Sequence, residues 1–497
     1  MEKKVFSFLI ILLTCSFPAT LQAQEVMIEG ISGQQFHGVQ PIDGKGYYTF
    51  YRKEKGLKIK SNFHLKIYDL DLRQLSESTI ELSRKAALKG GTFNGSNFLF
   101  SFIDPKSRKV TYKSFDENGQ TGDKELKEKI KRNFLKQKRF HPSVFPSGNS
   151  GFYILDYTKG KKIGYRVRKV DNNLNLIWEE KFNPEKGQAQ VLHVESSDEN
   201  VLLVVQVREK SSLKDPIETI VVLDGQTGKQ RFSFPLKQEN IKLMPSAYLL
   251  QDNNTFICAG MYAPIEAASE NEDGLFFMEL DQSGKKTAFR QATWVGDLKT
   301  SIEKHAFGTA WWSTNPKIFF QEIRQYEDGY QFIGETFRRA TSGTAIVSHM
   351  VENSGPGASL AVLDFIVFNV DKNLEVFEKI QFIPKEKMTV WIPTVDDYSL
   401  PLDSYFKNYN LLSFRFTENW DDELNAVIFY NWGRGRPYVG YAPLTDAIRI
   451  NPKKIYLSKA AANFGTANVI KSKKDQVLIY EHNKKTKTLK LWIETLE

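Results

Sequence analysis

The sequence predicts an all-β protein folded as a β-propeller, and three observations lead there. A phrase in which one alternating strand ends at an Asp, turns and leaves as a second strand occurs six times. The intervals between these turns are close to the length of one four-stranded blade. Each end of the chain holds part of a further unit, and the two parts together make one complete blade.

Residues 1–23 are expected to be a signal peptide. They combine a basic start (MEKK), an apolar run (VFSFLIILLT) and a small-residue exit (SFPATLQA), which are the three regions of a secretory leader. A membrane anchor is the alternative, but the apolar run falls short of the roughly 20 residues that a spanning helix needs. Cys15 leaves lipid anchoring open, although Thr14 is larger than the residue that usually precedes a lipoprotein cysteine. We expect export to the periplasm or cell surface, with residues 24–497 forming a single propeller domain and no later transmembrane segment.

The repeated turn has a simple physical basis. An Asp side chain can accept hydrogen bonds from backbone amides two residues on, and a neighbouring Asn or Gly tolerates positive φ. A Ca²⁺ loop would need several oxygen ligands at fixed offsets, and most of these turns offer only one or two carboxylates. We therefore predict hairpin turns without bound metal. The spacing between turns is 45 to 57 residues and finally 90, with the turns aligned at Asp71, Asp116, Asp171, Asp224, Asp281 and Asp371.

Further alternating strands precede each turn, so each unit is expected to hold four antiparallel strands, A to D, with the Asp turn between C and D. The expected units cover 36–83, 87–128, 140–183, 188–236, 244–294, 318–383, 398–444 and a last unit from Thr466. In the seventh unit Gly433-Arg434-Gly435 is expected to replace the Asp turn. The last unit lacks a D strand, and VMIEGISG from Val26 would supply it and close the ring without an open edge. Eight blades are predicted, with seven as the alternative; a stack of β-sandwich domains would explain neither the spacing nor the partial units.

Two insertions are predicted to be helical. KELKEKIKRNFLKQKRF, from Lys124, places Leu126, Ile130, Phe134 and Leu135 on one helical face. DLKTSIEKHAF, from Asp297, is the second short helical segment. Insertions in repeat folds map to loops on a face of the molecule, where sites usually lie.

Charge and cysteine content narrow the function classes. Without the leader, the chain has 66 Lys and Arg against 58 Asp and Glu, a net charge of +8, with the two signs mostly interspersed. Such an excess supports at most adhesion to anionic envelope surfaces or glycans. Nucleic-acid binding is not expected, because no basic stripe interleaves with aromatic residues. Cys258, alone after export, sits in the alternating strand TFICAGMY and is predicted to be a buried structural thiol.

Three resemblances concern the fold. LDGQTGKQRFSF resembles the turn of pyrroloquinoline-quinone-type propeller repeats through Asp224, Thr227 and Gly228, but it lacks the later Trp of that pattern. SFDENG resembles the start of the Asp box of sialidase-like propellers, although Gly119 falls one residue late and no Trp follows. The whole chain is similar in style to uncharacterised secreted propellers of Gram-negative envelopes. These resemblances imply blade geometry, and we expect no quinone or other cofactor.

No local motif for catalysis is present. The seven His residues show no metal-ligand spacing, so no metal site is predicted and the catalytic residues, if there are any, are unknown. His141 and His193 lie on expected innermost strands. Gly90 and Gly91, in LKGGTFNGSN, are interpreted as a loop. Carboxylate pairs near aromatic residues could serve a glycosidase, but we interpret them as parts of solvated loops beside a blade. They are Asp396 and Asp397 near Tyr398, and Asp421 and Asp422 near Trp420.

The candidate ligand-binding residues are Trp311, Trp312 and Trp391, since an exposed indole can stack on a sugar or anchor a protein partner. Packing of Trp311 and Trp312 at a blade end is the alternative. We hypothesise a secreted or periplasmic propeller that binds or presents a protein or glycan partner. The alternative is a glycan-active hydrolase or lyase with residues from several blades meeting over the central channel.

Overall fold

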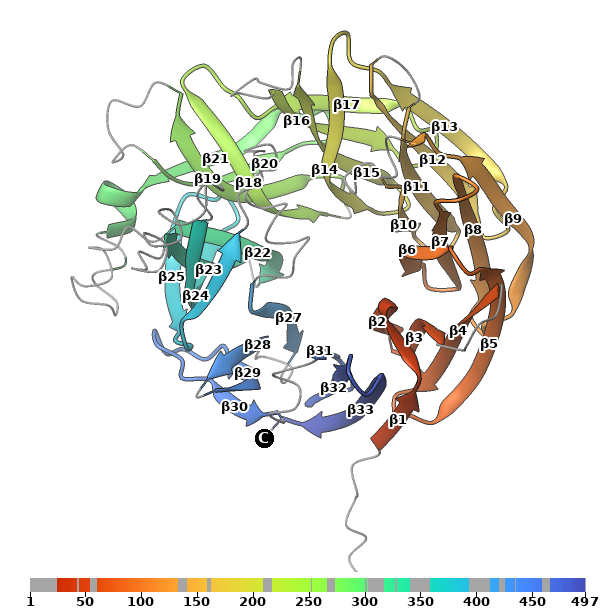
Figure 1. Ribbon diagram of the computed structural model, residues 1–497. Helices are drawn as coiled ribbons and strands as arrows, with labels where there is room; N and C mark the ends of the chain where they lie inside the picture. The colour runs from red at the N-terminus through yellow and green to blue at the C-terminus, as the bar shows by residue number, and fades with distance from the viewer. Residues whose placement is uncertain are drawn as a thin grey trace, which may run out of the picture.

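The fold is described from a computed structural model (Figure 1). It describes residues 25–496 except 43, 54–59, 133–140, 159–161, 209–216, 252, 266–272, 300–301, 303–316, 327–328, 340–357, 393–411, 420–424, 434 and 458–464.

Eight antiparallel sheets are arranged in a ring, each with its first strand innermost (Figure 1). Blade one consists of β2 (Ile31–Ile42), β3 (Gly46–Lys53), β4 (Lys60–Asp69) and β5 (Gln74–Ser83). Blade two consists of β6 (Ala87–Phe93), β7 (Asn97–Asp104), β8 (Lys109–Asp116) and β9 (Thr121–Lys129). Blade three consists of β10 (Ser143–Ser147), β11 (Gly151–Tyr157), β12 (Tyr165–Asp171) and β13 (Leu176–Phe182). Blade four consists of β14 (Gln188–Ser196), β15 (Asn200–Arg208), β16 (Ile217–Asp224) and β17 (Gln230–Pro235).

The second half of the ring repeats the same order. Blade five consists of β18 (Ile241–Leu250), β19 (Phe256–Pro264), β20 (Gly274–Leu280) and β21 (Lys286–Thr293). Blade six consists of β22 (Lys317–Tyr326), β23 (Gly329–Arg339), β24 (Ala358–Asp371) and β25 (Phe377–Ile383), with β26 (Met388–Ile392) as a fifth strand on β24. Blade seven consists of β27 (Phe414–Asn419), β28 (Asn425–Gly433), β29 (Arg436–Pro443) and β30 (Lys453–Tyr456). The prediction of eight blades is confirmed over seven.

Blade eight closes the ring as the sequence predicts. It contains β31 (Gly465–Lys471), β32 (Gln476–Asn483) and β33 (Thr488–Thr495), and its outer strand is β1 (Glu25–Glu29) from the other end of the chain. Ile28 pairs with Leu489, and its side chain is buried in the cluster that joins blades eight and one. The contact between the two ends of the chain therefore completes the last sheet.

The Asp turns bond as expected, with one correction. Asp116 Oδ1 accepts from the amides of Asn118 (2.9 Å) and Gln120 (2.7 Å), two and four residues on. In blade one the residue that does this is Asp69, which accepts from Asp71 N and Arg73 N, so the alignment on Asp71 was two residues late.

In five of the six Asp turns the third residue after the Asp has positive φ, and in three of them it is Leu rather than Gly; in the Asp224 turn it is the fourth residue, Gly228. Leu72, Leu174 and Leu374 have φ of 62°, 63° and 61°, where Gly119 and Gly284 stand in two other blades. These Leu side chains are almost completely buried. Burial of the side chain therefore offsets the strain that a left-handed conformation costs a residue with a Cβ.

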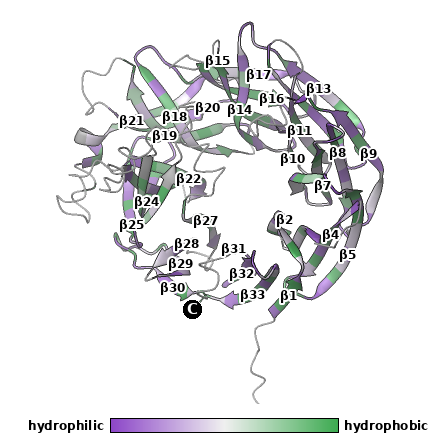
Figure 2. Cartoon of the chain, viewed as in Figure 1, coloured by the Kyte–Doolittle hydropathy of each residue, from purple (hydrophilic) through white to green (hydrophobic). Residues whose placement is uncertain are grey.

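The core lies between neighbouring blades. Between blades one and two, Phe50 and Phe100 stack with ring centroids 3.9 Å apart, and Phe63, Phe102 and Phe115 complete the cluster. The middle strands carry continuous runs of buried apolar residues, such as Phe152–Leu155 in β11 and Val201–Val205 in β15. Because successive side chains point to opposite faces of a strand, these runs give each blade two apolar faces against its neighbours; Figure 2 colours the chain by hydropathy. Cys258 is buried here as predicted, and burial raises the pKa of its thiol.

One of the two helical predictions is wrong. Residues 124–129 belong to strand β9, where Leu126 pairs with Tyr112 of β8 and packs on the core. Leu126 and Ile130 are four residues apart, a spacing that fits one face of a helix and one face of a strand equally. Residues 133–140 of this insertion lie outside the described residues. At the second insertion the structure has one π-helical turn, Trp294–Leu298, which shares only Asp297 and Leu298 with the expected segment. Residues 300–301 and 303–307 of that segment lie outside the described residues.

Blade seven differs from the expected unit. The turn after Gly433 joins β28 to β29, since Gly433 pairs with Arg436, and is therefore the B–C turn and not the C–D turn. The D strand is β30, which lies beyond the expected boundary at 444. Within the described residues no helix is long and apolar enough to cross a membrane.

Candidate functional site

The three predicted Trp residues are not brought together by the described structure. Trp311 and Trp312 lie outside the described residues. The backbone of Trp391 lies in β26, opposite Ser359 of β24, at the extra strand of blade six. The carboxylates Asp396, Asp397, Asp421 and Asp422 also lie outside the described residues, as do the nearby Tyr398 and Trp420. These ligand-binding predictions stay predictions.

His193 does lie on an innermost strand, β14, as predicted. Its ring stacks on Tyr248 with centroids 4.4 Å apart, and Nε2 lies 2.9 Å from Glu195 Oε1. His141 does not lie on an innermost strand: it is a bend residue two positions before β10, because Pro142 separates it from Ser143. Among the described residues no group of three or more His, Cys, Asp or Glu is arranged to hold a metal ion.

Among the described residues a pocket lies where blades one, two and three meet, on the face that carries the A–B and C–D turns. Its volume is about 570 Å³, within the range of ordinary ligand sites. It is formed by the last residues of the innermost strands β2, β6 and β10 and by the turns that follow them. The lining residues are His37, Gln40, Pro41, Lys45, Tyr48, Gly91, Thr92, Phe93, Asn94, Gly95, Pro146 and Asn149.

A close approach of β2 to β6 sets the inner wall of the pocket. A Cβ at Gly91 would lie 2.3 Å from the Phe100 ring and 3.3 Å from His37 Nε2, so no larger residue fits there. His37 hydrogen-bonds the Gly91 backbone, and its ring meets Phe100 edge-on at 6.0 Å. Burial lowers the pKa of His37, and the bond to Gly91 opposes this only in part. The imidazole is therefore neutral at pH 7. Gly90 and Gly91 belong to strand β6, so their interpretation as a loop is wrong.

A network of amide side chains builds the opposite wall. Asn94 Nδ2 donates to Gly151 O (2.9 Å) and to Asn172 Oδ1 (2.7 Å), which ties the A–B turn of blade two to blade three. Asn172 Nδ2 in turn donates to Asn149 O at 3.1 Å. Gly95, with φ of +100°, lies so close to Asn149 that a Cβ would sit 1.9 Å from its Oδ1. The two turns are thus fixed relative to each other before any ligand binds.

The groups left for a ligand are polar and uncharged, apart from one amine at the rim. Gln40, Thr92 and Asn149 present amide and hydroxyl groups, while Tyr48 and Phe93 contribute aromatic surface. Lys45 at the rim is paired with Glu117 of blade two at 2.8 Å. None of the twelve lining residues, all of which are described, is Asp or Glu. The pocket suits binding of a neutral polar ligand and lacks the carboxylate pair of a glycosidase.

The sequence interpretation missed this pocket because its residues come from three A–B turns. The available signal was the recurrence of turn residues at the same place in neighbouring units, Asn94-Gly95 in one and Gly148-Asn149 in the next. That signal indicates turns, and only the ring brings the turns together.

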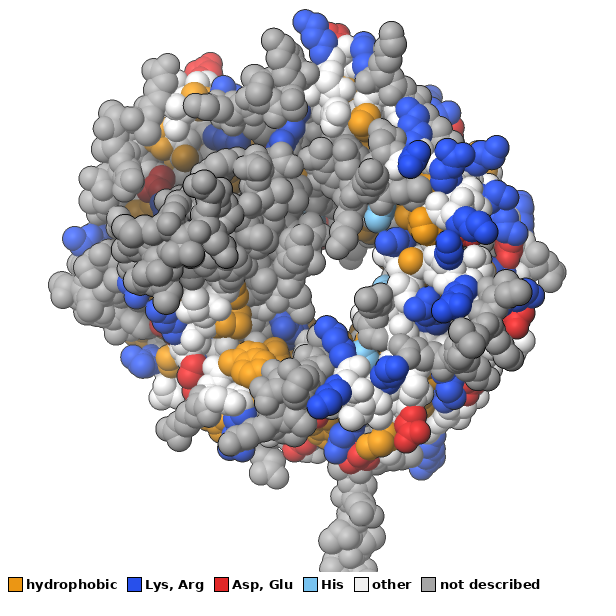
Figure 3. Space-filling view, viewed as in Figure 1, with side chains coloured by type: hydrophobic (Ala, Val, Ile, Leu, Met, Phe, Trp, Pro, Cys, Tyr) orange, Lys and Arg blue, Asp and Glu red, His pale blue; other side chains and the backbone are white. Residues whose placement is uncertain are grey.

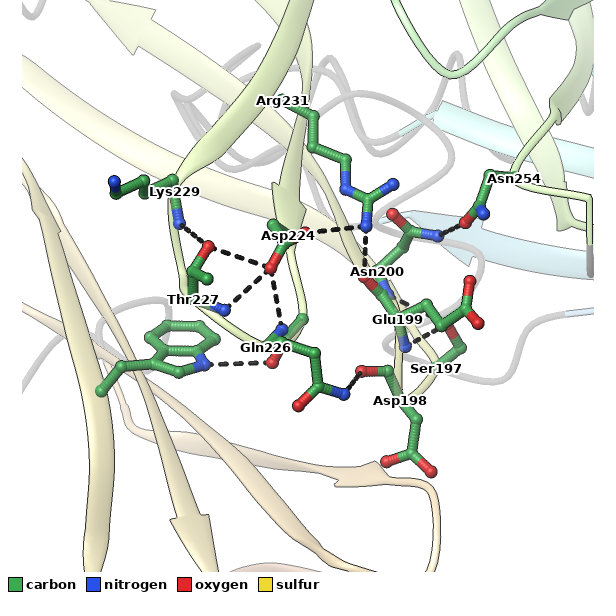
Figure 4. Close-up of polar contacts among 12 residues, drawn as sticks. Ser197, Asp198, Glu199, Asn200, Asp224, Gln226, Thr227, Lys229, Arg231 and Asn254 are labelled. Atoms are coloured by element: carbon green, nitrogen blue, oxygen red, sulfur yellow. Dashed lines mark hydrogen bonds and ion pairs between the residues drawn. The ribbon is translucent and has the colours of Figure 1, made fainter.

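The structure explains why the Asp224 turn, which resembles a pyrroloquinoline-quinone-type repeat, lacks the Trp of that pattern in its own blade. The missing aromatic residue comes from the preceding blade: Trp178 of β13 covers Gly228, and its Nε1 donates to Gly225 O at 3.0 Å. Asp224 holds the turn through the amides of Gln226 and Thr227, and Arg231 bonds Asp224 at 2.8 Å (Figure 4). The arrangement is a joint between blades three and four.

Comparison with solved structures finds other propeller-containing proteins at low similarity. The chain aligns with a quinohemoprotein alcohol dehydrogenase from Comamonas testosteroni (9% identity, TM-score 0.40, 95% of this chain and 76% of that one). It also aligns with the β-propeller domain of the trilobed protease from Pyrococcus furiosus (10% identity, TM-score 0.37, 85% of this chain and 97% of that one). A third match is a prolyl endopeptidase (12% identity, TM-score 0.37). The alignment covers 91% of this chain but only 54% of the length of the endopeptidase.

Sequence comparison identifies a family whose function is unknown. None of the curated proteins is significantly similar to this chain. The family of unknown function DUF6770 matches over residues 1–497. Because the match covers the whole chain, this propeller belongs to the DUF6770 family.

Proposed function

We propose that this protein is a binding propeller that takes a neutral saccharide, free or at the end of a glycan, in the pocket between blades one, two and three. The observation that supports this is the lining itself. Aromatic and Pro surfaces adjoin uncharged amide and hydroxyl groups, the combination that recognises the apolar faces and hydroxyls of a sugar. His37 contributes an uncharged imidazole ring to the lining of the pocket, because burial lowers its pKa.

A binding role is favoured over glycan cleavage by the same lining. Glycoside hydrolysis requires two carboxyl groups that flank the bond to be broken, and the pocket residues provide none. The rigid turns also fit a binding site, because a preformed pocket loses little entropy when the ligand binds.

A thermal-shift screen with neutral oligosaccharides tests the proposal, followed by affinity measurements on variants. A ligand at 100 times its Kd should stabilise the fold by about 2.7 kcal/mol. Gln40→Ala and Thr92→Val should each weaken the bound sugar by about 3- to 10-fold, the value of one hydrogen bond. Gln230→Ala, an exposed Gln in β17, is the matched control and should change nothing. Unchanged affinity in both pocket variants would contradict the proposal.

We further propose that residues 1–23 direct export and are removed, so that the working protein begins at Gln24. The support is the order of basic, apolar and small-residue regions in the sequence. N-terminal sequencing of the protein recovered from the periplasmic or secreted fraction tests this. An intact Met1 in a cytoplasmic fraction would overturn it, and an acylated Cys15 would replace it with lipid anchoring.

A further inference from the structure

The two faces of the ring differ in charge. Because successive strands of a blade are antiparallel, the A–B and C–D turns lie on one face, and the B–C and D–A connections lie on the other. The first face carries the Asp turns. On the second face, exposed Lys and Arg gather in blades eight, one, two and three. They are Lys53, Arg84, Lys85, Lys106, Arg108, Lys109, Lys129, Arg132, Lys162, Lys186, Lys484, Lys485 and Lys487. Figure 3 shows Lys and Arg side chains gathered over this half of the ring.

The densest part of this surface is the basic corner of blade two, formed by Lys106, Arg108, Lys109, Lys129 and Arg132, all of them exposed. Lys106, Arg108 and Lys109 come from the B–C turn. Lys129 and Arg132 come from the end of β9 and the residues after it. Ile130 N donates to Arg108 O at 2.8 Å, which holds the two segments together.

Two like charges face each other in this corner. Lys109 and Lys129 are direct cross-strand partners of β8 and β9, and such partners have their Cβ atoms about 5 Å apart. Like charges directly opposite in a sheet are destabilising. The pairing therefore concentrates positive charge at a cost to the stability of the blade.

The nearest carboxylates are already engaged. Asp104 Oδ1 accepts from Lys106 N (2.9 Å) and Ser107 N (3.3 Å), so it holds the B–C turn. Glu128 points to blade three, where it bonds Arg166 at 2.6 Å and also Arg168. None of the five corner cations forms a salt bridge with a carboxylate among the described residues. Their charges are thus available to an external anion.

The chemistry around the corner indicates the kind of anion. None of the exposed large hydrophobic side chains among the described residues belongs to blade two, whereas docking on a lipid surface uses buried apolar area as well as charge. Among the described residues of blade two there is also no exposed aromatic ring on which a base could stack, which single-stranded nucleic acid requires. An exposed polar surface with two Arg and three Lys fits repeated carboxylate or sulfate groups on a chain.

We propose that the basic corner of blade two is a docking surface for an acidic polysaccharide, one that carries carboxylate or sulfate groups. It lies on the face opposite the saccharide pocket, and it does not depend on that pocket. The flanking cations of blades one and three extend the surface, so a polymer longer than the corner gains further contacts along the ring.

The test is binding of the full chain to dextran sulfate and to a polyuronate at several salt concentrations, with uncharged dextran measured alongside to give any binding that comes from the saccharide pocket alone. The variant Lys106→Glu/Lys129→Glu is expected to lose affinity by at least about tenfold near 0.15 M salt, and affinity of the wild type should fall as salt rises. The control Lys229→Glu/Lys285→Glu makes the same charge change at exposed C–D turns of the other face and should keep nearly full affinity. Equal losses in the two double variants would mean that only net charge matters and would overturn the proposal.

A single variant separates binding from folding. Lys109→Glu places opposite charges at the cross-strand pair with Lys129, so the melting temperature should stay equal or rise while polysaccharide affinity falls. Gln40→Ala, in the pocket, should leave this affinity unchanged, so the two sites can fail independently. Tighter binding to duplex DNA or to anionic lipid vesicles than to either polysaccharide would replace the proposed partner class and overturn the assignment.

Discussion

Lys385 Nζ lies 3.1 Å from Glu335 Oε1, and neither side chain is exposed to solvent. The Glu335 carboxylate also accepts from the amides of Ser413 and Phe414, at the start of blade seven. Lys385 Nζ donates to Ser413 Oγ at 3.0 Å. This ion pair of blade six therefore holds the first strand of the next blade by a set of charge-assisted hydrogen bonds.

Breaking this pair should be costly. Glu335→Gln leaves Lys385 buried without its counter-charge, and removing one partner of a buried pair costs about 3–5 kcal/mol. Urea unfolding of the variant measures the loss. The control is Glu81→Gln, which removes an exposed partner of Lys60 and should cost less than about 1 kcal/mol. A loss of similar size in both variants would show that the buried pair has no special role.

The joint between Trp178 and Gly228 should show coupling. Gly228 has φ of +75°, and a Cβ there would lie 2.5 Å from the Trp178 ring, so Gly228→Ala should destabilise the protein by about 2 kcal/mol or more. Trp178→Leu removes the obstructing ring. The double variant is expected to be less destabilised than the sum of the two single changes, as measured in a double-mutant cycle. Strict additivity would contradict a direct contact.

Stability should fall in acid because of the Asp turns. Hydrogen bonds from the Ser283 hydroxyl and the Lys285 amide lower the pKa of Asp281. In Asp224, burial raises the pKa, but bonds from Thr227 and Arg231 outweigh it and the pKa is lowered. A lowered folded-state pKa gives stability that is complete above the unfolded value near 4 and is lost as the pH falls through the folded value.

Melting temperatures measured between pH 6 and pH 2 check this sign. The variant Asp224→Asn/Asp281→Asn keeps side chains that can accept the turn hydrogen bonds but cannot titrate. The wild type should be more stable than this variant at pH 6, and the difference should shrink towards pH 2. A constant difference over the whole range would rule out titration of these turns as its source.

Closure of the ring by β1 should carry measurable stability. Ile28→Ala removes a buried side chain from the last strand of blade eight, and such changes cost about 2–5 kcal/mol. Met27→Ala, at the neighbouring residue whose side chain is 58% exposed, should change stability by no more than about 0.5 kcal/mol. Chemical denaturation of both variants distinguishes a structural strand from a loosely attached one.

The sequence by itself determined the repeating architecture of this protein. The period of the Asp turns, the alternation of apolar residues and the partial units at the two ends predicted eight blades and the closing strand, because these depend on local hydrogen bonding and strand periodicity. Local ambiguity caused the errors. Leu126 and Ile130 fit a helix or a strand equally, and Asp69 and Asp71 compete as the turn residue until the register of β4 and β5 selects Asp69.

Only the tertiary structure decided where the two proposed binding surfaces lie. Positive and negative residues alternate along the chain, but successive connections lie on opposite faces of the ring, so charges that are mixed in sequence become separated in space. The pocket between blades one, two and three arises in the same way, from His37, Gly91 and Asn149 in three separate units. A site built from equivalent turns of neighbouring blades leaves no local motif, since its residues meet only when the blades pack side by side.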